Sequence, residues 1–439
     1  MLVLWITEII IISFILISII MDIHYIINIA KTQKYLKTNI RDFELSRKIS
    51  MIIVIPVLRE QNIICDTIDY FGNMLYDDNL EVKLLIAGTQ REKNTLSDFG
   101  FKKTTKEVAD NHILNRTFCH NFSVFSYEAD DLLLGDRATQ INFAVDNYLK
   151  DGNTFDIVGV FDADSRPTLS TLMEVGYRYS VDNMCSYQQP AFFLDTANRM
   201  CKNKENPILV ANALYQNTWS IISEIPMWLK YDKGYGESVN NFYCIGHGEF
   251  FPYSINKKYR FPEHEVTDGI QIGYRLGMAG EKVAILNNYC NDDVPHDFRT
   301  LINQHRRWFG GCMRLREAYD WCCKSNNGKA KKANVFLGLW SQFRWAYTAP
   351  IYLVILVASL MISILYGKYI FLYLMFALLI AYCYLLPLIS IKITPIESEI
   401  KWYHILTLPI AIGVKSLGPN YYIINNITGR KNIYGKVER

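Results

Sequence analysis

Two long runs without a charged side chain constrain the fold most strongly. They cover residues 349–366 and 369–391, and Gly367 and Lys368 separate them. A helix of about 20 apolar residues crosses a hydrocarbon core of about 30 Å. A pair of buried core helices is the alternative, but the runs are too long and too uniformly apolar to favour it. We therefore expect a helical hairpin that spans a membrane.

The segment 2–29 is a third apolar region, although it carries Glu8, Asp22 and His24. It is long enough to cross a bilayer, and it lacks the basic start and the small-residue cleavage site of a signal peptide. Six basic residues follow it: Lys31, Lys34, Lys37, Arg41, Arg47 and Lys48. Because basic residues gather on the cytosolic side of a span, we expect the N-terminus outside. The expected protein is a multi-pass plasma-membrane protein with its middle domain in the cytosol.

These segments define the expected organisation. It consists of a transmembrane helix (1–30), a basic linker (31–50), a cytosolic domain (51–325), an interfacial helix (326–347), a C-terminal membrane region (348–429) and a basic tail (430–439). Trp340 and Trp345 suit headgroup depth, although a plain core helix fits 334–347 equally well. The stretch 402–425 could be a third C-terminal span or a helix in the interface. The basic tail favours an even number of crossings after the domain.

The middle of the chain has the mixed composition of a soluble domain. The net charge of +3 is too small to indicate a nucleic-acid partner. The ten cysteines form no CxxC pair and no regular spacing, which argues against a zinc site or a disulfide framework. We expect reduced thiols in a cytosolic domain.

Strand and helix patterns alternate through this domain. Apolar runs rich in β-branched residues predict strands at 51–57, 81–87, 123–127 and 155–160, and the spacing predicts helices at 62–76 and 136–149. This order predicts an α/β fold with a mostly parallel sheet and helices on both faces. In such sheets, ligands bind outside the carboxyl ends of the strands.

Four charged residues fall at the predicted strand ends: Arg59, Glu60, Asp162 and Asp164. Two carboxylates two residues apart in a cleft would repel each other without a cation. Mg²⁺ and Mn²⁺ prefer such oxygen ligands and can also bind substrate phosphates. Taken alone, the pair is equally well explained as a solvated turn.

Three later motifs add weight to the first interpretation. They are GHGEFF at 246–251, VTDGIQIGYRLGMAG at 266–280 and QHRRW at 304–308. Arg306 and Arg307 could neutralise a pyrophosphate, and Trp308 could stack against a sugar ring. A basic amphipathic helix on a membrane surface is the alternative for the last motif.

The order and spacing of IPVLRE, GDRATQINFAV, FDADS, QQP, GHG, TD and QHRRW, with the flanking spans, resemble a known family. The chain is similar to the membrane-integrated family-2 glycosyltransferases of the cellulose, chitin and hyaluronan synthase type. The shared pattern runs from about 51 to 311, and the last residues, IYGKVER, resemble a common tail. The resemblance implies a GT-A fold and a nucleotide-sugar donor, most often a UDP-sugar.

The resemblance also implies roles for individual residues. Asp162 and Asp164 would bind the donor diphosphate through Mg²⁺ or Mn²⁺, and Asp268 would be the general base. The remaining implied positions are Pro56 and Glu60 for the nucleotide, Gln188, Gln189 and Pro190 for the pocket lining, Gly246, His247 and Gly248 beside the acceptor, and Gln304, Arg307 and Trp308 for the pyrophosphate and the acceptor sugar.

The sequence departs from the family pattern at two places. The family usually has an Asp after the second strand that contacts the nucleotide base, but 84–94 has none, and Thr89 or Glu92 could substitute. The family's catalytic acid is often one of a pair, and here Gly269 stands at the second position. The base is then Asp268 after a small shift, or one of the nearby acids Glu263, Glu265 and Glu249. A helix N-cap is the structural alternative for Asp268.

The implied reaction is direct displacement at the anomeric carbon, so an α-linked donor would give a β-linkage. Our leading hypothesis is a processive synthase that extends a polysaccharide and exports it through the bilayer. The alternatives are a single transfer to a lipid-linked acceptor and a catalytically dead scaffold that binds nucleotide-sugar. The few expected spans could form a channel only with interfacial helices, in an oligomer, or with an export partner.

Overall fold

The computed structural model describes residues 2–37, 43–130, 136–232, 242–265, 267–325 and 331–430. The remaining residues include 38–42 of the predicted linker, 326–330 of the predicted interfacial helix and 431–439 of the basic tail. Of these predictions, the basic tail therefore lies almost wholly outside the described part of the chain.

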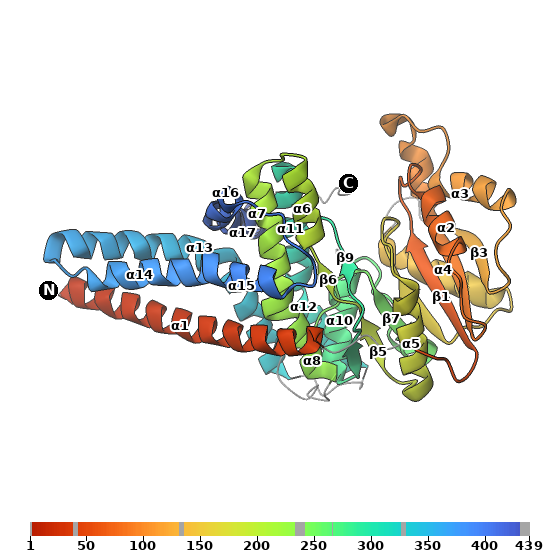
Figure 1. Ribbon diagram of the computed structural model, residues 1–439, viewed down its shortest axis with the longest axis horizontal. Helices are drawn as coiled ribbons and strands as arrows, with labels where there is room; N and C mark the ends of the chain where they lie inside the picture. The colour runs from red at the N-terminus through yellow and green to blue at the C-terminus, as the bar shows by residue number, and fades with distance from the viewer. Residues whose placement is uncertain are drawn as a thin grey trace.

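A seven-stranded sheet forms one end of the molecule (Figure 1), with the strand order β3-β2-β1-β4-β7-β5-β8. Its strands are β1 (Ile49–Pro56), β2 (Leu80–Thr89), β3 (Phe122–Ala129), β4 (Ile157–Val160), β5 (Ser186–Gln188), β7 (Glu249–Pro252) and β8 (Val283–Ile285). The strands pair in parallel except β7, which runs antiparallel to β4 and β5. Strands β6 (Ala191–Phe192) and β9 (Cys290–Asn291) form a separate short ladder. The predicted mostly parallel sheet is confirmed.

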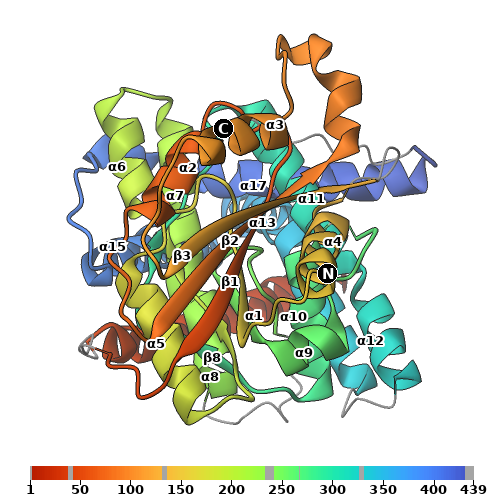
Figure 2. The same ribbon diagram turned by 90° about the vertical axis from the view of Figure 1, so that its right-hand side faces the viewer.

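Helices cover both faces of this sheet because its central strands are apolar on both sides. Ile53 and Ile55 of β1 pack against α2 (Ile64–Gly72), α3 (Thr105–Leu114) and α5 (Leu169–Val181). The alternate residues Ile52 and Val54 pack against α4 (Arg137–Lys150). Figure 2 views the molecule from the sheet end, where β1, β2 and β3 lie side by side. The short helices η1 (Gln90–Thr95) and η2 (Ser97–Phe99) follow β2.

A helical layer lies between the sheet and the long helices (Figure 1). Its elements are α6 (Leu194–Lys202), α7 (Pro207–Trp219), the π-turn η3 (Ser220–Glu224), α8 (Ile225–Asp232), α10 (Asp268–Ala279), α11 (Phe298–Met313) and α12 (Leu315–Lys324), and α9 (Tyr253–Tyr259) follows β7. In this layer, Ile225 and Trp228 of α8 and Ile272 of α10 belong to the same apolar core as Val54 of β1. The layer therefore joins the sheet to the rest of the molecule.

Three helices are long and apolar enough to cross a membrane, and they project from the other end. They are α1 (Leu2–Leu36), α13 (Lys332–Tyr366) and the helix formed by α14 (Ile370–Ile380), η5 (Ala381–Leu385) and α15 (Leu386–Ile393). Large apolar side chains such as Ile9, Leu353 and Ile364 are exposed on them. Exposed apolar surface of this kind suits contact with lipid tails.

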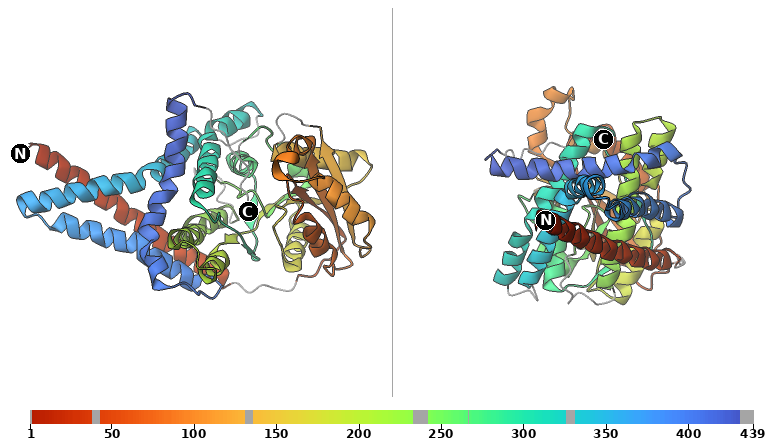
Figure 3. Two further views of the ribbon diagram at one scale, coloured as in Figure 1. Left: turned by 90° about the horizontal axis from the view of Figure 1, so that it is seen from above. Right: turned by 90° about the vertical axis from the view of Figure 1, so that its left-hand side faces the viewer.

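Two boundaries differ from the expected organisation. The predicted interfacial helix and the span after it are one helix, α13, and Pro350 lies inside it. Helix α1 continues beyond the predicted end into the basic segment as far as Leu36. At the C-terminus, α16 (Trp402–Leu406) precedes α17 (Leu408–Ile427), which lies crosswise to α13 and α14 (Figure 3). Among the described helices, α17 is not one of the three candidate spans.

Candidate active site

A cavity of about 1700 Å³ begins at the sheet edge where the parallel strands end. Its wall contains Pro56 and Glu60 after β1 and Asp162 and Asp164 after β4. The other predicted residues in the wall are Gly246, His247, Asp268, Gln304, Arg307 and Trp308. Strand topology brings these residues together, because the carboxyl ends of parallel strands share one edge and β7 begins at that edge.

Arg137 connects the two groups of acids in this cavity. It is the first residue of α4, and its guanidinium lies 2.6 Å from Asp268 Oδ2 and 3.5 Å from Asp162 Oδ1. It also donates to the Gly246 carbonyl. Burial disfavours the charge, but Asp268, Asp162 and Glu249 raise the pKa of Arg137 above its usual value. Arg137 is not one of the predicted site residues, although its motif, GDRATQ, stands at the start of a predicted helix.

Asp268 is the first residue of α10 and is 8% exposed. Thr267, not Asp268, occupies the N-cap position, so the capping alternative does not explain the acid. A carboxylate in the first helical turn is stabilised by the helix dipole, and here it also pairs with Arg137. Asp268 thus lies in the cavity wall, paired with a buried cation.

Glu249 explains the glycine that follows Asp268. A Cβ atom on Gly269 would lie 2.6 Å from Glu249 Oε1 and 2.6 Å from Gly246 Cα. Glu249 is fully buried at the start of β7 and accepts a 2.6 Å hydrogen bond from Gly246 N–H. Burial raises its pKa to about 7, against the opposing effect of Arg137. A carboxylate from another strand therefore occupies the space where a side chain at 269 would lie.

The other two candidate acids differ in their surroundings. Glu265 is in the cavity wall and forms an ion pair with Arg314. Glu263 accepts a 2.8 Å hydrogen bond from Asn142 Nδ2. Among the described residues, Glu263 does not line the cavity. Asp268 and Glu265 are therefore the acids of this group that reach the reaction space.

The QQP segment supports the GHG loop instead of lining the cavity. Gln188 and Gln189 are fully buried, and Gln188 Nε2 donates to the His247 carbonyl at 3.0 Å. A Cβ atom on Gly248 would lie 2.7 Å from Gln189 Cβ, and the φ of Gly248 is 61°, so this position needs glycine. Within the described residues, Gln188, Gln189, Pro190 and Gly248 are all outside the cavity wall. These residues thus support the GHG loop, and their direct contact with donor and acceptor stays a prediction.

His247 is the member of the GHG loop that faces the cavity with a polar side chain. Its Nε2 lies 2.9 Å from Asp292 Oδ2, and both residues are in the wall. Burial disfavours the imidazolium, but the Asp292 carboxylate raises the pKa of His247 well above the ordinary value. The pair therefore places a charged, oriented imidazole beside Asp268 and the GHG backbone.

Neither residue suggested for the nucleotide base reaches the cavity in the described structure. Thr89 is 1% exposed and accepts from Arg91 N–H at 3.3 Å. The buried Glu92 carboxylate accepts from Arg59 N–H at 2.8 Å and from Thr105 Oγ1 at 2.8 Å. Glu92 thus holds the loop after β1 in place. Arg91 and Phe99 are in the cavity wall at this end.

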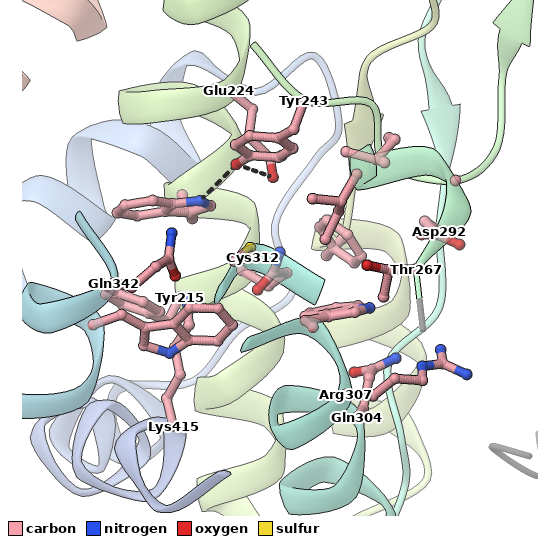
Figure 4. Close-up of a pocket in the computed structure, with 18 of the residues that line it drawn as sticks. Tyr215, Glu224, Tyr243, Thr267, Asp292, Gln304, Arg307, Cys312, Gln342 and Lys415 are labelled. Carbon is pink, nitrogen blue, oxygen red and sulfur yellow. Dashed lines mark hydrogen bonds between the residues drawn. The ribbon is translucent and has the colours of Figure 1, made fainter. Parts of the chain in front are cut away.

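Helix α11 brings the QHRRW motif to the cavity. Gln304, Arg307 and Trp308 are in the wall, and His305 is buried behind them. Gly311 lets α11 approach the start of α10, since a Cβ atom there would overlap the Thr267 side chain. Figure 4 shows Gln304 and Arg307 on the same side of the cavity as Thr267. The motif is therefore fixed next to Asp268.

The cavity continues from this polar end to the long helices. Its wall there is mainly apolar, although Ser18, Asp22, Arg344 and Thr348 also line it. The apolar residues come from α1, α13 and α14: Phe14, Ile17, Met21, Leu353, Leu356, Leu378 and Leu379. Between the two ends, the wall includes Trp219, Tyr243, Trp345 and Lys415. One space thus joins the strand-end carboxylates to a groove among the candidate membrane spans.

Asp162 and Asp164 offer a donor set that fits Mg²⁺ or Mn²⁺. Such ions commonly use one or two protein carboxylates and complete their shell with substrate phosphates and water. The described residues contain no group of three or more His, Cys, Asp or Glu side chains arranged for a metal. A two-carboxylate site completed by a diphosphate is the arrangement that these residues allow.

Comparison with known proteins finds one family model that matches part of the chain. The model described as glycosyl transferase family group 2 matches residues 218–386. A search of curated proteins finds no match. Similar solved structures include the mannosyltransferase PcManGT from Pyrobaculum calidifontis in complex with GDP-Man and Mn²⁺, at 15% identity and a TM-score of 0.49, covering 92% of this chain and 98% of that chain.

The S. aureus protein TarS, residues 1–349 in complex with UDP-GlcNAc, has 8% identity and a TM-score of 0.40, covering 87% of this chain and 92% of that chain. The family match includes the GHG loop, Asp268 and the QHRRW helix, which the structure gathers around one cavity. The chain is thus similar to glycosyl transferase family group 2 over residues 218–386, which is less than half of its length.

Proposed function

We propose that this protein transfers one sugar from a nucleotide-sugar to a lipid-linked acceptor, with inversion at the anomeric carbon. One observation carries the proposal. The cavity that contains Asp162, Asp164 and Asp268 continues into a groove walled by Phe14, Leu353 and Leu378 of the long helices. A sugar polymer would need a polar path, whereas an apolar groove of this kind suits a lipid chain. The geometry thus favours single transfer over the processive hypothesis.

The donor would lie at the sheet edge. Asp162 and Asp164 would hold Mg²⁺ or Mn²⁺, which supplies charge neutralisation for a diphosphate when it is bound. Pro56 and Glu60 border the same space, and Arg307 faces it from α11. The guanidinium of Arg307 would stabilise the charge that develops on the departing nucleoside diphosphate. A UDP-sugar is the donor class that the sequence resemblance suggests.

Asp268 would act as the general base. The acceptor oxygen attacks the anomeric carbon, its proton passes to the Asp268 carboxylate, and the bond from the anomeric carbon to the diphosphate oxygen breaks. Arg137 would orient the Asp268 carboxylate through the 2.6 Å contact. Trp308 and the GHG loop would hold the acceptor in line with the donor, which contributes through proximity. We further propose that α1, α13 and the α14–α15 helix span the plasma membrane with the sheet in the cytosol.

Turnover by the purified protein in nanodiscs tests this proposal. A panel of UDP- and GDP-sugars with Mn²⁺ or Mg²⁺ would be combined with a lipid extract, and nucleoside diphosphate release and product size would be measured. Asp164→Asn should abolish release. Asp78→Asn is the matched control, because Asp78 is exposed and precedes β2 at the opposite edge of the sheet.

The size of the product separates the hypotheses. A lipid product with one added sugar supports the proposal. A long polymer would favour the processive synthase instead. If nucleotide binds but no donor is turned over with any lipid fraction, the scaffold hypothesis is the one to pursue.

A further inference from the structure

Lys415 of α17 points into the cavity where its wall changes from polar to apolar. Figure 4 shows it extending from α17 toward Tyr215. Its ammonium nitrogen lies 4.5 Å from the ring centroid of Tyr215, 5.0 Å from that of Trp219 and 5.8 Å from that of Trp345. Aromatic faces stabilise a cation at such distances. The side chain is thus held as a cation although it has left bulk water.

The charged and titratable groups around Lys415 leave this cation without an ion-pair partner. Among ion pairs of the described residues, none includes Lys415. Its nearest acid, Glu224 of η3, accepts hydrogen bonds from Tyr243 Oη at 3.0 Å and Ser220 Oγ at 3.1 Å. Burial lowers the pKa of Lys415 to about 8, and Glu224 opposes this effect. Lys415 therefore remains charged at pH 7.

The other elements packed on α17 add no competing anion. His305 of α11 is buried, and burial lowers its pKa to about 3, so it is neutral at pH 7. Arg344 of α13 donates to Tyr25 Oη at 2.6 Å, and Tyr215 and Tyr382 share a hydrogen bond of 2.5 Å. The neighbourhood of Lys415 is therefore cationic or neutral except for Glu224.

Two buried polar groups of α13 border the same part of the cavity. Gln342 is 7% exposed, and its Oε1 has no hydrogen-bond partner within the described structure. The indole Nε1 of Trp345 is also buried without a partner there. Both residues are in the cavity wall. Buried polar groups normally find partners, so these atoms indicate a polar ligand group at this depth.

We propose that Lys415, Gln342 and Trp345 form a binding site for the phosphate of a lipid phosphate. The Lys415 ammonium and the Trp345 indole N–H would donate to phosphate oxygens, and the Gln342 amide would donate once rotation exchanges its oxygen and nitrogen. The attached chain would lie among Phe14, Leu353 and Leu378, where the cavity wall is apolar. This inference rests on the proposed lipid-linked acceptor and assigns the recognition of its anionic group to a site remote from the donor carboxylates.

The test measures binding to the full chain in nanodiscs by tryptophan fluorescence. Farnesyl phosphate is the probe, farnesol controls for partition of the chain into lipid, and inorganic phosphate tests for a free-anion site. We expect the protein to bind farnesyl phosphate at least about tenfold more tightly than farnesol, because hydrogen bonds to charged groups are among the stronger ones. Inorganic phosphate should compete poorly.

Three variants test whether Lys415 causes the preference for farnesyl phosphate over farnesol. Lys415→Met should lose the preference for phosphate over alcohol, and Lys415→Arg should retain it. Lys392→Met is the matched control, since Lys392 is an exposed lysine at the end of α15. Replacing a buried charge by an apolar side chain of similar length is commonly tolerated, so Lys415→Met should fold, and its thermal midpoint checks this.

The outcomes separate this inference from the proposed function. An unchanged phosphate preference in Lys415→Met overturns the inference, even if lipid-linked acceptors are glycosylated. Equal competition by inorganic phosphate overturns the lipid assignment. Conversely, a preference for farnesyl phosphate that depends on Lys415 supports the site, whatever the transfer assay yields. A polymer in the transfer assay would contradict only the proposed function.

Discussion

Replacing glycine by alanine should have opposite effects on stability at two positions of α17. A Cβ atom on Gly418 would lie 2.6 Å from Arg306 N, 2.7 Å from His305 Cβ and 2.8 Å from Ile302 O, all on α11. A Cβ atom on Gly413 would meet nothing within 4 Å. Both residues lie inside the helix Leu408–Ile427. Gly418→Ala therefore tests the close crossing of α11 and α17, and Gly413→Ala is its matched control.

The expected changes in the free energy of unfolding have two contributions. Alanine in place of glycine inside a helix stabilises the fold by about 0.5–1 kcal/mol, and both variants gain this. Overpacking costs about 1–3 kcal/mol, and Gly418→Ala alone incurs it, because its new neighbours are backbone atoms that cannot rotate away. We expect Gly413→Ala to be more stable than the parent and Gly418→Ala to be less stable than Gly413→Ala by about 1–3 kcal/mol.

Activity should follow the same order. An ordinary contact begins at 3.4 Å, so α11 must move by about 0.8 Å (3.4 minus 2.6) to accommodate the methyl group that Gly418→Ala introduces. Because α11 carries Arg307 and Trp308, and a misplacement of about 1 Å can cost roughly 100-fold, we expect kcat/KM to fall between about 10- and 100-fold.

Thermal unfolding and steady-state turnover in the same nanodiscs check both expectations. If Gly418→Ala matched Gly413→Ala in stability and in rate, the helices would not cross as closely as the structure shows. A loss of activity in both variants would point instead to the cavity wall near α17, because Gly413 also borders that space.

Three further predictions concern the polar end of the cavity. Asp268→Asn should lower kcat by about 10²–10⁴ while leaving the KM for the donor unchanged; a nearly normal rate would assign the base to Glu265. Gly269→Ala should destabilise the protein by about 1–3 kcal/mol and reduce turnover, because the new methyl would meet Glu249 and Gly246; unfolding measured beside Gly413→Ala checks it. Glu249 has a pKa of about 7 in the fold against an ordinary 4.5, so the folded chain holds a proton that the unfolded chain releases, and stability should fall as pH rises from 4.5 to 7. Glu249→Gln should remove that slope in unfolding measured across pH 4–8, and an unchanged slope would contradict the burial effect.

The sheet and its strand-end acids could be predicted because their signals are local. Runs such as 51–57 are apolar on both faces, which a parallel sheet covered by helices requires. A residue that follows a parallel strand lies at the ligand-binding edge whatever the loop conformation. Asp162 and Asp164 accordingly lie in the cavity wall.

The supporting network could not be predicted, because it depends on contacts between distant segments. Arg137 meets Asp268, which lies 131 positions away, and Glu92 is engaged by residues from two other elements. The burial of Gln188 and Gln189 is likewise a property of how the GHG loop folds over them. Composition suggested a boundary near Pro350, yet α13 continues through it, since neighbouring groups can satisfy the single backbone carbonyl that a proline leaves free.

Helix α11 connects the two ends of the cavity, because it is in close contact with the start of α10 at one end and with α17 at the other. At the polar end, Gly311 admits the side chain of Thr267, the residue before Asp268. At the membrane end, Gly418 of α17 lies against the backbone of Ile302 and Arg306. Tightly packed backbones transmit displacement, because they cannot absorb it by side-chain rotation. A ligand that moves α17 at Lys415 would therefore shift α11, and with it the spacing between Trp308 and Asp268. A displacement at one end of the cavity should therefore reach the other end through α11.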